Sequence, residues 1–211
     1  MGNVVQIRRN KRKAPAAVNG KVPPLRVCNK TLRPREHLTP DEVDKLMTTA
    51  AKLGRHGPRD ATLLLMAYRH GLRVSELVAL RWDQIDFKHG LLHVNRSKAG
   101  LESTHPLHGP QLRALRALKR AAGASPYVFI TERGGPLTTA TVRKLMARAG
   151  KEAGLSFSVH PHMLRHATGY KLANDGHDTR SIQHYLGHRS IQSTARYTAL
   201  APDRFKGFWK D

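Results

Sequence analysis

Cysteine is nearly absent from this chain of 211 residues, since Cys28 is its only one. A single thiol forms no disulfide within the chain and supplies no cysteine cluster for a structural zinc ion. The chain also lacks an apolar run long enough to cross a membrane, a basic amphipathic anchor, and an apolar segment following its first basic residues. We therefore expect a cytoplasmic protein with neither a secretion signal nor a membrane partner.

Acidic residues are scarce as well. The chain contains 15 Asp and Glu against 37 Lys and Arg, which gives a formal net charge of +22. That excess is far larger than solubility requires, so it predicts a polyanionic partner. Because nothing in the sequence suits a membrane surface, the charge favours nucleic acid over lipid as this partner.

The basic residues are concentrated near the N-terminus. Residues 1–36 hold ten Lys or Arg and one acid, and so carry +9 of the total, while residues 37–211 carry +13. The first segment also contains four prolines and shows no helical or strand periodicity. It can therefore bury too little apolar surface to offset the entropy cost of ordering. We expect residues 1–36 to form a disordered basic arm ahead of a domain that is itself basic.

The remaining length, with 39% hydrophobic residues in the whole chain, suits one globular core. Thr39-Pro40-Asp41-Glu42 has the composition of a capping box with a first-turn proline, so a helix is expected to start there. Asp178 and Ser190 are suited to be N-caps, and Gly187 to be a C-cap. Helical periodicity predicts further helices at 61–68, 75–80, 111–121, 138–153, 162–174, 178–186 and 190–197.

Between residues 85 and 107 the pattern changes to short strands, at 91–95 and 103–107. The turn-forming stretch Lys98-Ala99-Gly100 separates them, which predicts a hairpin with Lys98 near its tip. No internal repeat is visible. The predicted fold is therefore mainly α with a small antiparallel β-sheet, in the α+β class.

Three stretches gather the polar residues that suit catalysis. They are Gly-Leu-Arg-Val-Ser-Glu-Leu at 71–77, His-Met-Leu-Arg-His at 162–166, and Leu-Gly-His at 186–188, followed nine residues later by Tyr197. Together they resemble the catalytic boxes of the tyrosine recombinase (phage integrase) family over roughly residues 37–200. The resemblance is closest to the short fimbrial phase-switch invertases, and it is carried by the run from Val159 to Thr198.

The resemblance implies a tyrosine recombinase catalytic-domain fold, and an enzyme that cuts and rejoins DNA through a 3′-phosphotyrosine with neither metal nor ATP. Attack on a phosphodiester builds negative charge on the phosphate oxygens, which protonated arginines can stabilise with two hydrogen bonds each. The residues matching the family's motifs are Arg73 and Arg165 as phosphate ligands, Tyr197 as nucleophile, His162 as base or hydrogen-bond acceptor, Lys98 as proton donor to the leaving 5′-oxygen, His188 as a phosphate hydrogen-bond donor, and Glu76 as the carboxylate that orients Arg73.

The same resemblance implies double-stranded DNA as partner, a homotetramer on two synapsed sites, possible accessory DNA-bending proteins, and a place at the nucleoid. Inversion, integration and excision share this chemistry, so the residues leave that choice open. In the family, the segment after the nucleophile often docks into a neighbouring protomer. The apolar residues within 201–211 suit such a link between subunits and equally suit packing on the chain's own core.

Other interpretations of single residues stay open. His162 and His166 have the i, i+4 spacing of a zinc pair, but no carboxylate or cysteine completes an obvious ligand set, and His166 is expected to be structural or to support the site. Tyr170 is the rival nucleophile, and Arg96 is the rival of Lys98. At the level of function, the alternatives are a catalytically silent DNA-binding protein and a topoisomerase-like enzyme that relaxes DNA.

Overall fold

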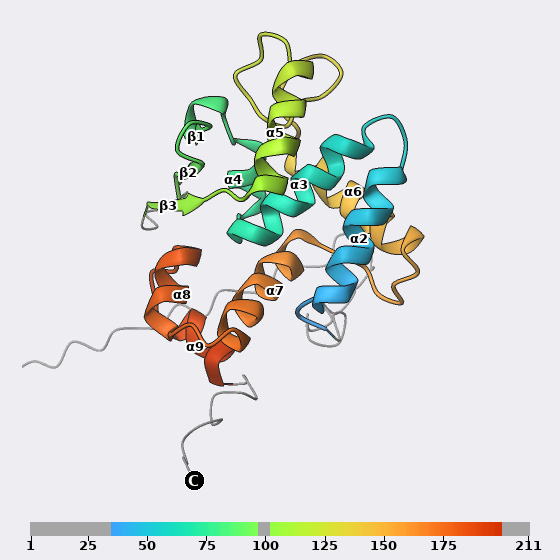
Figure 1. Ribbon diagram of the computed structural model, residues 1–211. Helices are drawn as coiled ribbons and strands as arrows, with labels where there is room; N and C mark the ends of the chain where they lie inside the picture. The colour runs from blue at the N-terminus through green and yellow to red at the C-terminus, as the bar shows by residue number, and fades with distance from the viewer. Residues whose placement is uncertain (1–34, 97–101, 200–211) are drawn as a thin grey trace, which may run out of the picture. The chain divides into compact units, whose positions relative to one another are not determined.

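The computed structural model describes residues 35–96 and 102–199, which are coloured in Figure 1. Helices dominate this part of the chain, and one three-stranded antiparallel sheet accompanies them, so the predicted fold class is confirmed. The α-helices are α2 (Pro40–Lys52), α3 (Gly57–His70), α4 (Val74–Val78), α5 (Gly109–Ala121), α6 (Thr139–Glu152), α7 (Pro161–Asn174), α8 (Thr179–Leu186) and α9 (Gln192–Ala199). The strands are β1 (Ile85–Asp86), β2 (Leu91–Val94) and β3 (Ser103–Pro106), and a 3-10 turn, η2 (Trp82–Gln84), precedes β1.

Helix α2 begins as its sequence predicts. The hydroxyl of Thr39 accepts a hydrogen bond from the Glu42 amide (3.3 Å), and the Glu42 carboxylate accepts one from the Thr39 amide (2.9 Å). Arg35 adds an ion pair to the same carboxylate at 2.7 Å. The capping box therefore satisfies amide groups that the first helical turn would otherwise leave without partners.

Four helices differ from the sequence expectation by two or more residues at an end, and one of them, α5, begins at Gly109 instead of Gln111. Helix α3 begins at Gly57, not Ala61, because its polar first turn packs against the end of α2, where a Cβ at Gly57 would lie 2.0 Å from the Ala51 carbonyl oxygen. Helix α4 ends at Val78, two residues early. Helix α9 starts at Gln192 and runs to Ala199, beyond Tyr197. Local periodicity does not reveal such tertiary contacts.

The sheet has the order β1-β2-β3. Strands β2 and β3 pair antiparallel from Leu91 opposite Pro106 to Val94 opposite Ser103, which confirms the predicted hairpin partners. The two-residue strand β1, which the sequence pattern did not separate, pairs with the start of β2. Lys98 lies outside the described residues.

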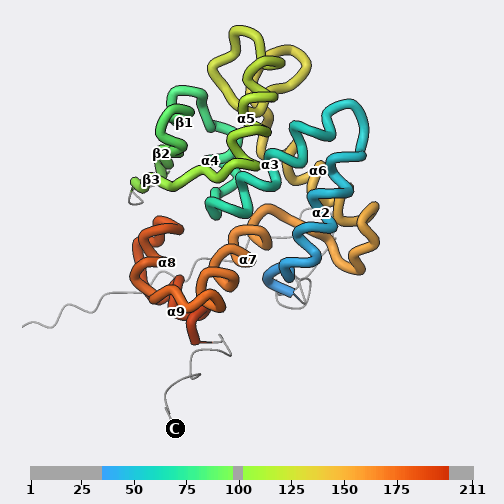
Figure 2. Tube along the Cα trace, viewed as in Figure 1, coloured from blue at the N-terminus to red at the C-terminus, as the bar shows by residue number. Residues whose placement is uncertain are grey.

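Most buried apolar side chains form one core among α2 to α7 and the sheet. A smaller cluster of Ala173, Ile182, Leu186 and Tyr197 lies where α7, α8 and α9 pack together. Figure 2 shows these three helices following one another at the C-terminal end of the described chain. Within residues 35–96 and 102–199, no helix is both long and apolar enough to cross a membrane.

Candidate active site

Arg73 is the N-cap residue of α4, and its side chain is 29% exposed. Its guanidinium donates to the Glu76 carboxylate at 2.7 Å, and its backbone amide donates to the same carboxylate at 2.9 Å. A further guanidinium nitrogen donates to the Gly187 carbonyl at 3.3 Å. The ion pair expected between Arg73 and Glu76 is therefore present, and it fixes the direction of the arginine.

Glu76 is buried, and burial alone would raise its pKa. The hydrogen bond from the Arg73 amide and the charges of Arg96 and Arg73 outweigh burial, so the pKa of Glu76 lies below its usual value. The carboxylate is therefore ionised at neutral pH and serves two arginines at once.

Arg165 on α7 is buried, with 3% of its surface exposed. It donates to the carbonyl oxygens of Gly71, in the turn before α4, and of Leu186, the last residue of α8. Burial, and then the charges of Arg73 and Arg96, lower the pKa of Arg165 to about 9. The guanidinium still carries its charge at neutral pH, and it joins all three sequence boxes at one place.

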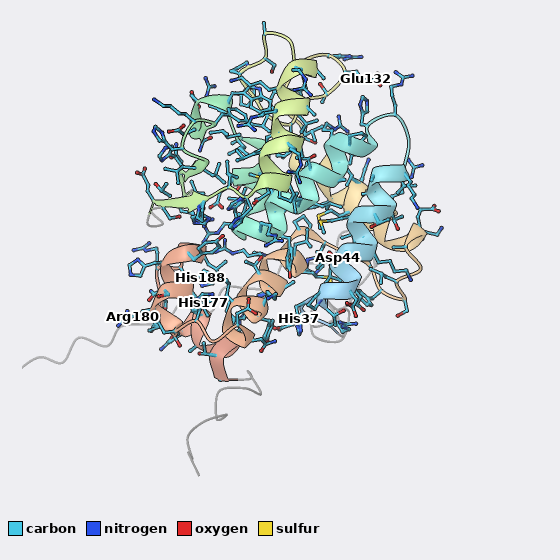
Figure 3. All side chains as sticks on the ribbon, in the orientation of Figure 1. His37, Asp44, Glu132, His177, Arg180 and His188 are labelled. Atoms are coloured by element: carbon cyan, nitrogen blue, oxygen red, sulfur yellow. The ribbon has the colours of Figure 1, made fainter. Side chains whose placement is uncertain are left out.

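His188 follows the αL turn at Gly187, where φ is 64°. Its Nδ1 lies 2.7 Å from the Thr194 hydroxyl, and Figure 3 labels the residue beside α8. Burial, followed by the charges of Arg165 and Arg73, lowers the pKa of His188 to about 3. The imidazole is therefore neutral at pH 7, so one ring nitrogen can donate a hydrogen bond and the other can accept one.

Tyr197 lies on α9 and is only 1% exposed. Its ring packs against α7 at Gly169, meets Tyr170 edge-on at 5.1 Å, and stacks near His188 at 6.3 Å between centroids. Burial raises the pKa of Tyr197, and nearby Arg196 and Arg165 oppose the change only in part. The phenol is therefore protonated at neutral pH and needs a proton acceptor to act as a nucleophile.

The structure thus brings together five of the seven residues named from the sequence: Arg73, Glu76, Arg165, His188 and Tyr197. His162 is exposed on the first turn of α7, with its ring 5.7 Å from that of His166. In the described part of the chain, no group of three His, Cys, Asp or Glu residues is placed to hold a metal ion, so the zinc interpretation gains no support.

Two further residues contact the site: His166, which the sequence left as a structural or supporting residue, and Arg96, which it left as the rival of Lys98. His166 has its Nδ1 2.8 Å from the hydroxyl of Tyr197. Arg96 has a fully buried side chain that pairs with Glu76 at 2.9 Å and donates to the Tyr185 carbonyl. His166 lies in the stretch His-Met-Leu-Arg-His at 162–166, which the sequence had already singled out. The position of Arg96 depends on partners 20 and 89 residues away, so no local signal marks it.

The chain is similar to known proteins in sequence and in fold. The model of the phage integrase family matches residues 36–204. The chain is 43% identical over 182 residues to the type 1 fimbriae regulatory protein FimE of Escherichia coli strain K12, and the match covers 83% of this chain and 91% of FimE.

Solved structures agree with that similarity. The crystal structure of XerA recombinase superposes with a TM-score of 0.70 at 26% identity, and covers 80% of this chain and 62% of that chain. A lambda integrase dimer bound to a COC′ core site superposes with a TM-score of 0.63 at 28% identity, and covers 84% of this chain and 50% of that chain. This chain therefore spans between half and two thirds of the solved chains that it resembles.

Proposed function

The chain belongs to the phage integrase family and is a site-specific DNA recombinase of the tyrosine type, and from this we propose that Tyr197 is the nucleophile that cuts and rejoins the DNA strands. In this step the Tyr197 hydroxyl oxygen bonds to phosphorus while the bond from phosphorus to the 5′-oxygen breaks. The products are a 3′-phosphotyrosine and a free 5′-hydroxyl, so one ester bond to phosphorus replaces another and its energy is retained for rejoining.

The convergence of Arg73 and Arg165 on one turn supports this proposal. Arg165 donates to the Leu186 carbonyl and Arg73 to the Gly187 carbonyl, directly before His188, and the Tyr197 ring stacks near that histidine. Two fixed cations beside a nucleophile suit a phosphate that gains negative charge in the transition state. Lys98, which follows β2 in the sequence, is the proposed proton donor to the 5′-oxygen, and the family resemblance assigns His162 as a base or hydrogen-bond acceptor.

The test is adduct formation on a nicked duplex that traps the covalent intermediate, without metal or ATP. The duplex carries inverted repeats taken from the DNA that flanks the gene. We expect wild type and Tyr170→Phe to form a protein–DNA adduct on a denaturing gel, and Tyr197→Phe to form none. An adduct with Tyr197→Phe would show that Tyr197 is not the nucleophile. Loss of the adduct in Tyr170→Phe alone would identify Tyr170 as the nucleophile.

We further propose that the partner is double-stranded DNA, bound as a homotetramer on two synapsed sites. The solved lambda integrase relative is a dimer bound to its core site, and residues 37–211 carry +13, which suits a phosphate backbone. We propose that the protein acts at the nucleoid in the cytoplasm, with accessory DNA-bending proteins as further partners.

We propose inversion as the outcome, because the chain resembles the fimbrial phase-switch invertases and the type 1 fimbriae regulatory protein FimE matches over 91% of its length. A plasmid with the two repeats in inverted orientation distinguishes the outcomes. Inversion predicts a changed restriction pattern at constant plasmid size. Relaxation of a plasmid without repeats would favour the topoisomerase alternative.

A further inference from the structure

The hydroxyl of Tyr197 has a defined partner on the neighbouring helix. The Nδ1 atom of His166, on α7, lies 2.8 Å from this hydroxyl oxygen, and the two rings meet edge to face at 5.8 Å between centroids. Burial raises the pKa of Tyr197, while burial and then the charge of Arg196 lower the pKa of His166 to about 3. Both groups are therefore neutral at pH 7, so the phenol donates and Nδ1 accepts.

We infer that His166 is a further catalytic residue and takes the proton of Tyr197 when the phenol attacks the DNA phosphate. This inference rests on the proposed function of Tyr197. As the bond between the phenol oxygen and phosphorus forms, the proton passes to Nδ1 of His166, and the departing 5′-oxygen receives a proton from Lys98. The step is balanced, because one bond to phosphorus replaces another and each proton has a named donor and acceptor.

Packing fixes the phenol in this position. Gly169 lies one turn after His166 and leaves the space in which the Tyr197 ring rests, and Tyr170 holds the ring edge-on. A proton acceptor must lie within hydrogen-bond reach of the proton that it takes, and His166 meets this requirement before DNA binds. Because its imidazole is neutral, His166 can act as a general base without first losing a proton.

The low pKa of His166 has causes that DNA would change. After burial, the contributions that lower it are, in order of size, electrostatic interactions with Arg196, His162, Arg165 and His160. A scissile phosphate at Arg73 and Arg165 brings opposite charge to the same place and favours the imidazolium. The phenol also loses its affinity for the proton as its oxygen bonds to phosphorus, so the transfer needs no free tyrosinate.

An exit for the proton is available along α7. The ring of His162 lies one helical turn before His166, at 5.7 Å between centroids, and it is exposed to solvent. His162 can therefore pass the proton from the buried site to water. In this scheme His166 takes the proton from Tyr197 first, and His162 releases it to solvent.

The alternative is that His166 only holds the phenol in place. An asparagine separates the two roles, because its amide oxygen can accept a hydrogen bond near the position of Nδ1 but cannot take the proton. We would measure single-turnover adduct formation at saturating trapping duplex for wild type, His166→Asn and His166→Ala. His184→Ala, which removes an exposed histidine of α8, is the matched control.

The expected result is a loss of at least about 100-fold in the His166→Asn cleavage rate, the lower end of the range for general acid–base catalysis, at wild-type affinity for DNA. In His166→Ala, added imidazole should fill the space and restore the rate in proportion to its concentration. Wild-type cleavage by His166→Asn, or an Ala rate that imidazole leaves unchanged, overturns the inference. Tyr197→Phe is run in parallel: if it still forms an adduct, the proposed function itself has failed.

Discussion

Gly169 determines where the ring of Tyr197 can lie. A Cβ built at this position would fall 2.5 to 2.7 Å from three ring atoms, closer than folded proteins allow. The ring is rigid and buried, so it would have to leave its place beside His166. The smallest side chain at a helical position thus controls the geometry of a residue 28 positions later in the chain.

We predict that Gly169→Ala slows adduct formation by at least about tenfold, because displacement of the phenol breaks its contact with His166. Alanine is the better helix former by about 1 kcal/mol, so a loss of activity here would not reflect a weaker helix. Gly135→Ala is the control, since a Cβ there meets only the Thr131 hydroxyl at 4.0 Å. Equal rates for both variants and wild type would contradict this account.

Between elements, the ion pair of Glu76 and Arg96 joins the start of α4 to the residues after β2. The two side chains are 2% and 0% exposed, and Arg96 also donates to the Tyr185 carbonyl on α8. Gly187 lies against Arg96, since a Cβ there would meet the Arg96 side chain at 2.8 to 2.9 Å. Arg96 therefore holds α4, the hairpin and the α8 turn around the two proposed phosphate ligands.

We predict that Glu76→Gln lowers the free energy of unfolding by about 3 kcal/mol, because it leaves Arg96 buried without a counter-charge. Cleavage should slow as well, since Arg73 loses the same partner. Urea unfolding at neutral pH measures the first effect. Glu132→Gln, which breaks an ion pair with Arg55 whose side chains are 60% and 79% exposed, should leave the midpoint near the wild-type value. Similar midpoints for the two variants would mean that the buried pair contributes little.

The sequence predicted the helices well because caps and apolar spacing are local signals. Thr39, Asp178 and Gly187 all cap helices as expected. The first turn of α3 was missed because Gly57 is helical for a tertiary reason, its close contact with the end of α2. Strand β1 was missed because two residues are too few to show alternation.

The site residues also separate into those that local motifs identify and those that only tertiary contacts bring to the site. Family motifs identified Arg73, Arg165, His188 and Tyr197, which the fold then placed together. The contact between His166 and Tyr197 spans 31 residues, and that between Arg96 and Tyr185 spans 89. Neither contact follows from spacing along a helix or strand, so only the packing of α7 on α9, and of β2 near α8, could reveal it.

At the scale of the whole molecule, charge is divided between the N-terminal segment and the rest of the chain. Residues 1–36 carry +9, and we propose that they contact DNA phosphates. Each neutralised phosphate contributes about −0.9 to the slope of log affinity against log salt. We predict that deletion of residues 2–34 weakens DNA binding and makes this slope less steep, as measured by titration at several KCl concentrations. An unchanged slope would exclude the segment from the interface.

Buried neutral histidines give the whole molecule a pH dependence. Gln111 donates to His70 at 2.7 Å, His70 lies 3.2 Å from His105, and His105 lies 2.9 Å from the Ser103 hydroxyl. This chain of hydrogen bonds has consistent donors and acceptors when both imidazoles are neutral. Burial first, then nearby positive charge, lowers the pKa of His70 to about 3 and that of His105 to about 4.

We predict that the free energy of unfolding falls as pH decreases below about 6.5. In the unfolded chain these histidines bind protons near pH 6.5, whereas in the folded protein they do so only near pH 3 to 4. The unfolded state therefore binds more protons in this window, and acid favours it by up to about 1.4 kcal/mol per pH unit for each histidine. His166 and His188 have pKa values of about 3 and add to the effect.

Urea unfolding between pH 7 and pH 5 tests this prediction, because carboxylates contribute mainly below that range. His70→Gln removes one titrating group and keeps an amide that can bond to its neighbours, so its stability should depend less steeply on pH than that of wild type. His184→Gln, an exposed histidine, should keep the wild-type slope. If His70→Gln and wild type lose stability in parallel, the buried chain of histidines is not the origin of the acid sensitivity, and protonation elsewhere must account for it.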